Sequence, residues 1–323
     1  MSGRVAVVGS YNQDHVWNSR ELPQPGATRF GNYASGPGGK GFNQAVAAAR
    51  AGAKVGFFCA LGEDAAAEHA RQLAGDEAIH LHVEARCETP SGSAGIFVGD
   101  DGRNMIVVAA GANAELSAAF ITSEMASAEV ADVVLAQLEV NPEAVVAALL
   151  AARSEGAISI LNPAPADAPT TARLLSLADV LTPNETEFAA MLARHDVVTV
   201  DADEIAGIGD SQLHRWCRQL AGSASVIVTL GKHGAFVSHP VDLRRGDADD
   251  CYRIAAESIR TIDSTGAGDA FNGALAAALS VAPPNAAFAE SVRFASRYAA
   301  MSTEAAGAAL AMPTLNAVLS RFD

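Results

Sequence analysis

The chain has 323 residues, and half of them are hydrophobic, which is enough for a sizeable core in one large domain or two smaller ones. Its 22 lysine and arginine residues face 37 aspartate and glutamate residues, so the formal net charge is −15. Such a charge repels nucleic acid and anionic membrane surfaces, which excludes both as partners. A polyanionic ligand must therefore be held by groups in its immediate surroundings.

Cysteine spacing and the apolar segments predict a cytoplasmic protein. The cysteines at 59, 87, 217 and 251 are far apart and form no CxxC pair, so neither a zinc site nor a disulfide framework is expected. The apolar run before Ser10 has five residues, which is too short for a signal peptide. The alanine-rich stretch 144–152 is bounded by Glu143 and Arg153, far short of the ~20 residues that span a bilayer.

Short β-rich runs alternate with helical patterns along the chain. This alternation predicts a mainly parallel sheet with helices on both faces. The turn 231–234 lies between two apolar runs and predicts an antiparallel hairpin at one side of that sheet. The expected strands are 5–8, 55–61, 133–138, 158–161, 180–181, 225–230 and 235–238, and the expected helices are 44–51, 65–73 and 143–153.

Two segments break the alternation, and we expect them to form a β-sheet lid over a site at the carboxyl edge of the main sheet. The predicted lid consists of 11–35 and 88–112, and the predicted α/β nucleotide- and sugar-binding domain consists of 1–10, 36–87 and 113–323. Residues 195–209 have no clear periodicity and are expected to be a loop or an insertion. Exposed edges of the lid strands predict a homodimer through the lid.

Residues 36–41, with the sequence GPGGKG, formally match the GxGxxG dinucleotide fingerprint. That reading is rejected because no strand runs directly into these glycines. A phosphate-binding P-loop is also excluded, because Ala34 holds its first glycine position and Gly41 replaces the required serine or threonine. What remains is a glycine-rich approach to a helix. It is either a plain tight turn or a place where exposed backbone, Lys40 and Asn43 hold the hydroxyls of a small polar ligand.

Polar side chains follow several of the expected strands. Asn12 and Asp14 would share one face of an extended segment, for ligand hydroxyls or for turn capping. Glu139 follows a strongly apolar strand, as a ligand-binding acid or a solvated one. Asn184 and Glu187 fit a capped helix start, and they also fit a site for hydrated Mg²⁺ beside nucleotide phosphates.

Residues 263–273, DSTGAGDAFNG, are the most informative stretch. Gly266, Ala267 and Gly268 leave backbone amides unobstructed at a helix N-terminus, where an anion such as phosphate is favoured. Asp269 would repel a simple phosphate ligand, but it is suited to removing a proton from a hydroxyl that attacks phosphorus. The segment therefore predicts phosphoryl transfer to an alcohol.

Taken together, residues 38–52, 182–187, 228–237 and 263–275 resemble the ribokinase, or PfkB-type, carbohydrate kinase family over nearly the whole chain. The resemblance is nearest to the ribokinases because of the short motifs at 12 and 14, 111–113, 137–139 and 161–165. The resemblance implies a three-layer α/β/α sandwich with a mainly parallel central sheet and a small β-sheet lid. It also implies transfer of the γ-phosphoryl group of ATP to a primary sugar hydroxyl, with D-ribose giving ribose 5-phosphate.

The resemblance also implies roles for individual residues. Asp269 would be the catalytic base, with the amides of Gly266, Ala267 and Gly268 stabilising phosphoryl charge. The expected sugar-binding residues are Asn12, Asp14, Gly39, Lys40, Asn43 and Glu139, together with Asp269. The expected nucleotide-site residues are Asn184, Thr229, Gly231, Lys232 and Gly234, and Glu187 would act on Mg²⁺ through water. An activating monovalent cation, K⁺, would be bound by Asp263, Thr265 and the carbonyls of Ser302, Ala305 and Gly307.

Two positions depart from the family pattern. Ala311 stands where many members of the family carry a serine hydroxyl, which bears on the cation site. Phe42 stands where a small residue is common, and its bulk is expected to reshape the sugar pocket. The alternatives for the acceptor are therefore a nucleoside, fructose, a fructose phosphate, deoxyribose or 2-keto-3-deoxygluconate. The alternative from another class is a non-catalytic sugar- or nucleotide-binding regulator.

Overall fold

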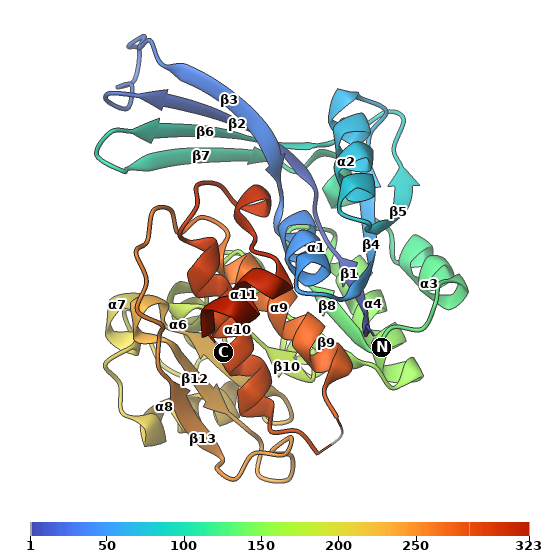
Figure 1. Ribbon diagram of the computed structural model, residues 1–323, viewed down its shortest axis with the longest axis vertical. Coiled ribbons are helices and arrows are strands. Elements are labelled where there is room, and N and C mark those ends of the chain that lie inside the picture. Colours follow the sequence, from blue (N-terminus) through green and yellow to red (C-terminus); the bar gives the residue numbers. More distant parts are fainter. Residues whose placement is uncertain (1, 284, 323) are drawn as a thin grey trace.

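The computed structural model describes residues 2–283 and 285–322 and has the predicted three layers, with a lid to one side (Figure 1). The central sheet has the strand order β13-β12-β11-β10-β9-β8-β1-β4-β5. The neighbouring strands β5, β4, β1, β8, β9, β10 and β11 run parallel to one another. β12 pairs antiparallel with β11, as the predicted hairpin requires, and β13 pairs antiparallel with β12. The strands are β1 (Arg4–Val8), β4 (Lys54–Leu61), β5 (His80–Ala85), β8 (Val133–Ala136), β9 (Ile158–Leu161), β10 (Val180–Leu181), β11 (Ser225–Thr229), β12 (Ala235–Ser238) and β13 (Cys251–Ile254).

Helices cover both faces of this sheet, and each face has its own apolar core. The alternation of strand side chains produces the two cores: Val5 and Val7 of β1 join one, while Ala6 and Val8 join the other. One face carries α1 (Lys40–Arg50), α2 (Ala65–Asp76), α9 (Ala267–Val281), α10 (Phe288–Ser302) and α11 (Leu315–Phe322). The other face carries α3 (Ala118–Ser127), α4 (Pro142–Glu155), α5 (Ala172–Leu175), α6 (Glu185–Arg194), α7 (Ala202–Ile205) and α8 (Asp210–Leu220).

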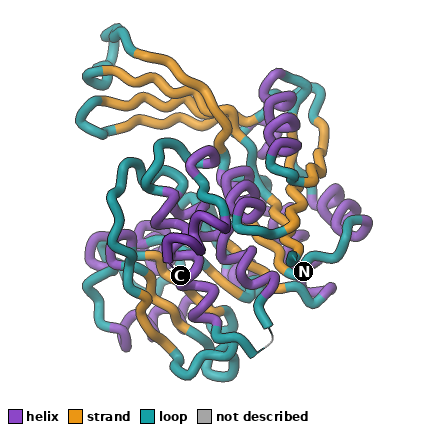
Figure 2. The backbone as a smooth tube through the Cα atoms, viewed as in Figure 1, coloured by secondary structure: helices purple, strands orange, loops and turns teal. Residues whose placement is uncertain are grey.

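The lid is a separate four-stranded sheet of order β3-β2-β6-β7, which projects beyond the sandwich (Figures 1 and 2). It consists of β2 (Asn12–Ser19), β3 (Asn32–Gly38), β6 (Gly92–Gly99) and β7 (Asn104–Ala109). Both predicted segments contribute a pair of strands to it. β2 follows β1 almost at once, and β3 runs almost directly into α1, so the root of the lid lies at the carboxyl edge of the main sheet.

Some element boundaries differ from the sequence-based expectations. α1 begins at Lys40, four residues before the predicted start, because Gly39 has a φ of 85° that turns the chain sharply from strand to helix. β8 ends at Ala136, two residues before the predicted end. The expected loop at 195–209 contains the one-turn helix α7. Within the described residues, no helix has the length and apolar character needed to cross a membrane.

Candidate active site

The predicted catalytic carboxylate lies where several chain segments converge. Asp269 is in the first turn of α9 and is only 6% exposed. Its Oδ2 accepts a hydrogen bond of 2.9 Å from Asn43 Nδ2, and its Oδ1 accepts one of 2.9 Å from Gln44 Nε2. Burial raises the pKa of Asp269, while nearby Lys40 and the two amide donors lower it. The result is a fixed carboxylate that is more basic than an ordinary aspartate.

The turn before Asp269 presents backbone donors. Gly266, the residue that precedes α9, has a φ of 75°, which glycine adopts without strain. Among the described backbone groups, no protein acceptor is found for the amides of Gly266 and Gly268. The Ala267 amide differs from the expectation, because it donates to the carbonyl of Ser264 at 3.2 Å. The geometry thus leaves the Gly266 and Gly268 amides free for an anion at a helix N-terminus.

A half-buried lysine lies among the acids of the candidate site. Burial lowers the pKa of Lys40, but the carboxylates of Asp269, Glu139 and Glu187 outweigh this effect, and the net pKa is raised. Burial raises the pKa of Glu187, and the Asn184 amide and Lys40 lower it again. Lys40 is therefore a positive charge that neutralises part of an acidic cluster.

Several of the predicted sugar-binding residues lie close to one another at the root of the lid. Asn12 is buried, and its Oδ1 accepts a hydrogen bond of 2.9 Å from Asn113 Nδ2. Asp14 lies directly over Gly38, where an added β-carbon would come within 2.2 Å of Asp14 Oδ2. Burial, followed by the charge of Glu139, raises the pKa of Asp14 to about 6.

Glu139 ties this side of the site to the start of α1. Its Oε2 accepts hydrogen bonds of 2.6 Å from Ser10 Oγ and 3.0 Å from the Lys40 amide. Gly39 has no side chain that could cap the helix, so a carboxylate from a distant loop performs this role. The local arrangement rules out the interpretation of Glu139 as an acid on a solvated loop.

The residues predicted to border the nucleotide lie at the start of α6 and in the β11–β12 connection. Asn184 and Glu187 form a reciprocal capping box with hydrogen bonds of 2.9 and 2.8 Å. This uses Asn184 Oδ1 and Glu187 Oε2, and leaves Glu187 Oε1 without a protein donor among the described groups. Thr229 forms an isolated parallel bridge with Asn184. The connection after Thr229 is the 3₁₀ turn η2 (Gly231–His233), in which Gly231 and Lys232 are exposed, and it ends at the half-exposed Gly234.

The proposed cation loop is drawn together by Asp263. Its Oδ1 accepts hydrogen bonds from the amide and the hydroxyl of Thr265, at 2.9 and 2.7 Å. Its Oδ2 accepts one of 2.9 Å from the Gly307 amide. Burial alone would raise the pKa of Asp263, but these bonds lower it below its usual value. In the described chain the carbonyls of Ala305 and Gly307 accept no protein hydrogen bond, while that of Ser302 accepts a long one of 3.5 Å.

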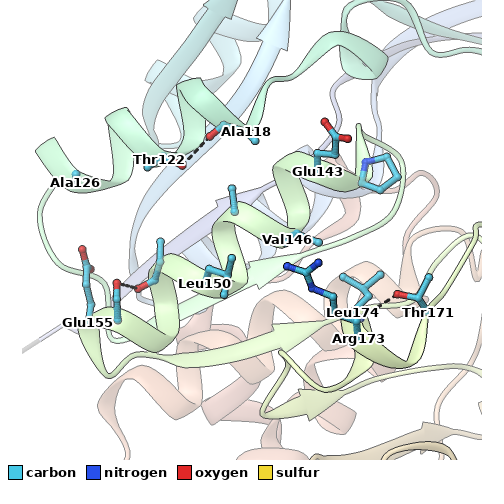
Figure 3. A pocket seen from close by; sticks show the side chains of 14 residues that line it. Ala118, Thr122, Ala126, Glu143, Val146, Leu150, Glu155, Thr171, Arg173 and Leu174 are labelled. Carbon is cyan, nitrogen blue, oxygen red and sulfur yellow. Dashed lines mark hydrogen bonds between the residues drawn. The ribbon is translucent and has the colours of Figure 1, made fainter.

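A groove elsewhere on the molecule contains none of these residues. It has a volume of about 910 Å³ and lies between α3, α4 and α5, where small and apolar side chains line it together with Glu143, Glu155 and Arg173 (Figure 3). The described chain contains no cluster of histidine, cysteine and acidic side chains that would hold a metal by itself. The converging helix N-termini around Asp269 therefore remain the candidate active site.

Comparison with known proteins decides the family. The model of the family described as "pfkB family carbohydrate kinase" matches residues 2–315. The chain belongs to the pfkB family of carbohydrate kinases. It is 36% identical over 325 residues to the ribokinase of Haemophilus influenzae, covering 100% of this chain and 99% of that protein.

Solved structures agree with this assignment. The ribokinase of Giardia lamblia superposes with a TM-score of 0.85 at 27% identity, covering all of both chains. The ribokinase of Arabidopsis thaliana complexed with ribose and ATP superposes with a TM-score of 0.83 at 26% identity, covering 99% of this chain and 98% of that one. The expected fold, a ribokinase-like sandwich with a small lid, is confirmed.

The prediction that the bulk of Phe42 reshapes the sugar pocket is wrong. Its side chain is 1% exposed and lies in the core, with its ring centroid 5.3 Å from that of Tyr11 and 5.9 Å from that of Phe57. Because successive helix positions point about 100° apart, Phe42 faces the sheet while Asn43 faces Asp269. Phe42 therefore anchors the root of the lid and does not fill the sugar pocket.

Several polar residues around the pfkB site received no role from the sequence. Gln44, Gln137, Asn162 and Asn272 are all buried and join one hydrogen-bond network with Asp269. One signal was available for Gln44, which is a large polar residue in the alanine-rich run that forms the buried side of α1. The others are brought together only by the fold.

Proposed function

We propose that this pfkB-family enzyme transfers the γ-phosphoryl group of ATP to the primary hydroxyl of D-ribose and forms ribose 5-phosphate. The observation that carries the proposal is the buried Asp269 carboxylate beside the free amides of Gly266 and Gly268 at the start of α9. A carboxylate at an anion site suits a reaction in which an alcohol attacks a phosphoryl group. The similarity to ribokinases, including one solved with ribose and ATP, supports the choice of substrates.

In the proposed reaction, the acceptor hydroxyl gives its proton to Asp269 while its oxygen forms a bond to the γ-phosphorus. The bond between the γ-phosphorus and the bridging oxygen breaks, and ADP leaves with the electron pair of that bond. The Gly266 and Gly268 amides stabilise the negative charge on the transferred group, with Lys40 as a nearby positive charge. The raised pKa of Asp269 improves its fitness as a base, because a stronger base receives the proton more readily.

The acidic pocket favours a neutral polyol over an anionic acceptor. Asp14 and Glu139 are close enough that the charge of Glu139 helps to raise the pKa of Asp14. A phosphorylated sugar or a sugar acid would add another negative charge beside these carboxylates. Carboxylates that accept hydrogen bonds from hydroxyls fit ribose, whereas a fructose phosphate or 2-keto-3-deoxygluconate would be repelled.

The placement of the aromatic side chains argues against a nucleoside. A nucleoside pocket needs an apolar or aromatic surface for the base, and the lid aromatics are the candidates. Tyr11 is fully buried against Phe42, and Phe30 is 98% exposed. Trp17 and Tyr33 pair with each other at odd positions of the register, so they point to the face of the lid opposite Asp14. Among the described strands of the lid, the face that carries Asp14 has aliphatic side chains but no aromatic ring on which a base could stack.

We further propose Mg²⁺ and a monovalent cation as activators. Glu187, through its free oxygen and bound water, and Asn184 would hold Mg²⁺, a cation that prefers oxygen ligands and would neutralise phosphate charge. The carbonyls of Ala305 and Gly307, with Ser302, Asp263 and Thr265, fit K⁺, since they offer oxygen atoms on two loops that already meet. Such an ion would hold the loop before Gly266 in shape. The absence of a side-chain oxygen at Ala311 leaves the ligand set to the backbone carbonyls and the other two residues.

The lid supports our proposal of a homodimer. The last strand of the lid, β7, pairs on one side only, and its apolar side chains are exposed, with fractions of 53% for Ile106, 72% for Val107 and 54% for Val108. An apolar edge strand of this kind needs a partner, and a second copy of the chain supplies one of the same chemistry. The proposed lid segments are 11–35 and 88–112, and β3 continues past the end of the first segment to Gly38. Light scattering of wild-type protein and a Val107→Asp variant tests it, since the variant should be monomeric if the lid is the interface.

The acceptor is tested by measuring ADP release with a panel of substrates. Ribose should give the highest kcat/KM, compared with deoxyribose, fructose, 2-keto-3-deoxygluconate and nucleosides. A higher value for any of the others would replace ribose as the acceptor. A lack of ADP release with every sugar, together with intact ATP binding, would favour the non-catalytic regulator.

A further inference from the structure

A continuous network of buried amides surrounds the catalytic carboxylate. It begins at Gln44, whose Nε2 donates both to Asp269 Oδ1 at 2.9 Å and to Asn162 Oδ1 at 3.1 Å. The Gln44 Oε1 accepts a hydrogen bond of 2.5 Å from Gln137 Nε2. Gln44 is fully buried, and every donor and one acceptor position of its amide is occupied. The orientation is fixed, because a carboxylate can only accept and so Nε2 must face Asp269.

The network then returns to the helix that carries the carboxylate. Asn162 Nδ2 donates to the carbonyl of Thr182 at 3.0 Å, and the Thr182 hydroxyl donates to Asn272 Oδ1 at 2.5 Å. Asn272 Nδ2 donates to the carbonyl of Gly268 at 2.8 Å. The hydrogen bonds therefore hold both the Asp269 side chain and the peptide carbonyl just before it. They join α1 and α9 to the ends of β9 and β10.

We infer that Gln44 is a positioning residue for phosphoryl transfer: its amide fixes the plane of the Asp269 carboxylate so that the remaining lone pairs meet the acceptor hydroxyl. This inference rests on the proposed function, in which Asp269 is the base. Each carboxylate oxygen already accepts one protein hydrogen bond, from Asn43 or Gln44. Each oxygen therefore retains a lone pair that can accept a further hydrogen bond. The direction of that lone pair is set by the amide that donates to the same oxygen.

Gln44 also affects the charge state of the base. Burial raises the pKa of Asp269, and the hydrogen bond from Gln44 is one of the effects that lower it. The charged groups that face Asp269 are Lys40 from α1, Glu139 after β8 and Glu187 from α6. Of these, Lys40 favours the ionised base, whereas Glu139 and Glu187 oppose it. Without Gln44, Asp269 would stay protonated to higher pH and would be inactive as a base there.

The test compares Gln44→Met with Gln137→Met, two identical substitutions at buried positions of the same network. Of these two residues, only Gln44 donates a hydrogen bond to Asp269, whereas Gln137 donates to Gln44. In Gln44→Met the acidic limb of the pH profile of kcat should move up by about one to two pH units, with an unchanged KM for ATP. At a pH below this limb, that displacement lowers kcat at least about tenfold. In Gln137→Met the limb should stay where it is in the wild-type protein.

An equal displacement of the limb in both variants, or none in Gln44→Met, overturns the inference, because Gln44 would then be only a core residue. If Gln44→Met does not fold, Gln44→Glu decides, since it keeps the volume and the hydrogen bond from Gln137. Two adjacent carboxylates cannot both ionise easily, so its acidic limb should move up further, and a wild-type limb again overturns the inference.

Titration of ¹³C-labelled aspartate by NMR separates this inference from the proposed function. The Asp269 signal is assigned by its absence in Asp269→Asn, and its pKa should be higher in Gln44→Met than in the wild-type protein. If the wild-type protein phosphorylates no sugar, the proposed function fails. The titration then still shows whether Gln44 holds the ionised carboxylate, and an unchanged pKa rejects that role.

Discussion

Replacing Asp14 with asparagine should stabilise the fold and weaken sugar binding at the same time. Asp14 is partly buried, and no protein group among the described residues donates a hydrogen bond to its carboxylate. Its pKa is raised from 3.8 to about 6, by burial first and by the charge of Glu139 second. Between these two pH values the unfolded chain has lost a proton that the folded chain retains. Stability therefore falls as the pH rises through this window, and the full penalty applies above about pH 6.

The size of the gain follows from the two pKa values. They differ by about 2.2, and each unit corresponds to ~1.36 kcal/mol, which sets a ceiling of ~3 kcal/mol at pH 7.5. Partial exposure of the carboxylate allows water and salt to screen it, which reduces the expected gain for Asp14→Asn to ~1–2 kcal/mol. At pH 5 only part of the window has been crossed, so the gain should be about half as large.

Removal of the negative charge of Asp14 should also weaken the binding of the sugar. A hydrogen bond to a carboxylate contributes ~1.5–3 kcal/mol, whereas one to a neutral amide oxygen contributes ~0.5–1.5 kcal/mol, so the exchange should cost about 1–1.5 kcal/mol. The KM for ribose should therefore rise about 5- to 10-fold in Asp14→Asn, while the KM for ATP stays unchanged.

Urea unfolding at pH 7.5 and pH 5, together with steady-state kinetics, measures both effects. Asp100→Asn is the matched control, because it neutralises an exposed lid carboxylate in the turn between β6 and β7. Its stability should change by no more than ~0.5 kcal/mol. The reasoning is refuted if Asp14→Asn is no more stable than the wild-type protein at pH 7.5, or if its gain is the same at both pH values.

Three other changes test the remaining parts of the site. Asp269→Asn should lower kcat by at least ~10²-fold while ATP still binds, because a positioned base is removed; kcat from ADP release and ATP affinity from calorimetry measure this. Replacement of K⁺ by Na⁺ at fixed ionic strength should lower kcat in the wild-type protein, and Asp263→Asn should remove that difference. Phe42→Ala should lower the free energy of unfolding by ~3–5 kcal/mol, because it leaves a cavity beside Tyr11 and Phe57, while the KM for ribose stays unchanged.

Each of these has an outcome that contradicts it. Near-normal turnover in Asp269→Asn would remove Asp269 from the mechanism. A wild-type rate that is the same in K⁺ and Na⁺ would argue against a selective cation site at Asp263. A changed KM for ribose in Phe42→Ala without loss of stability would return Phe42 to the sugar pocket.

The local geometry of the candidate site was predictable where its residues are close together in the sequence. The run 263–269 carries its glycines, its helix start and its acid within seven residues, so local backbone chemistry already implies an anion site with a base. Asn184 and Glu187 likewise form the capping box that their spacing predicts. Their contact with Mg²⁺ stays a prediction.

Contacts between distant segments were beyond the reach of the sequence. Gln44 and Asp269 are separated by 225 positions, and Lys40 and Glu139 by 99. No local pattern reveals that a loop carboxylate caps a helix that begins with glycine. The side to which Phe42 points was also misjudged, since a helix start can be rotated in several ways until the sheet below it is known.

The sequence by itself determined the fold class and the family: an acidic, alternating α/β chain with a glycine-rich helix start, an acid in the first turn of that helix, and two segments that break the alternation, because each of these depends on local pattern and composition. Only the tertiary structure decided which polar groups surround Asp269, why Glu139 is held at the start of α1, and that the lid aromatics face away from Asp14. Burial and hydrogen bonding between distant segments set those positions and the shifted pKa values, and neither exists before the chain has folded.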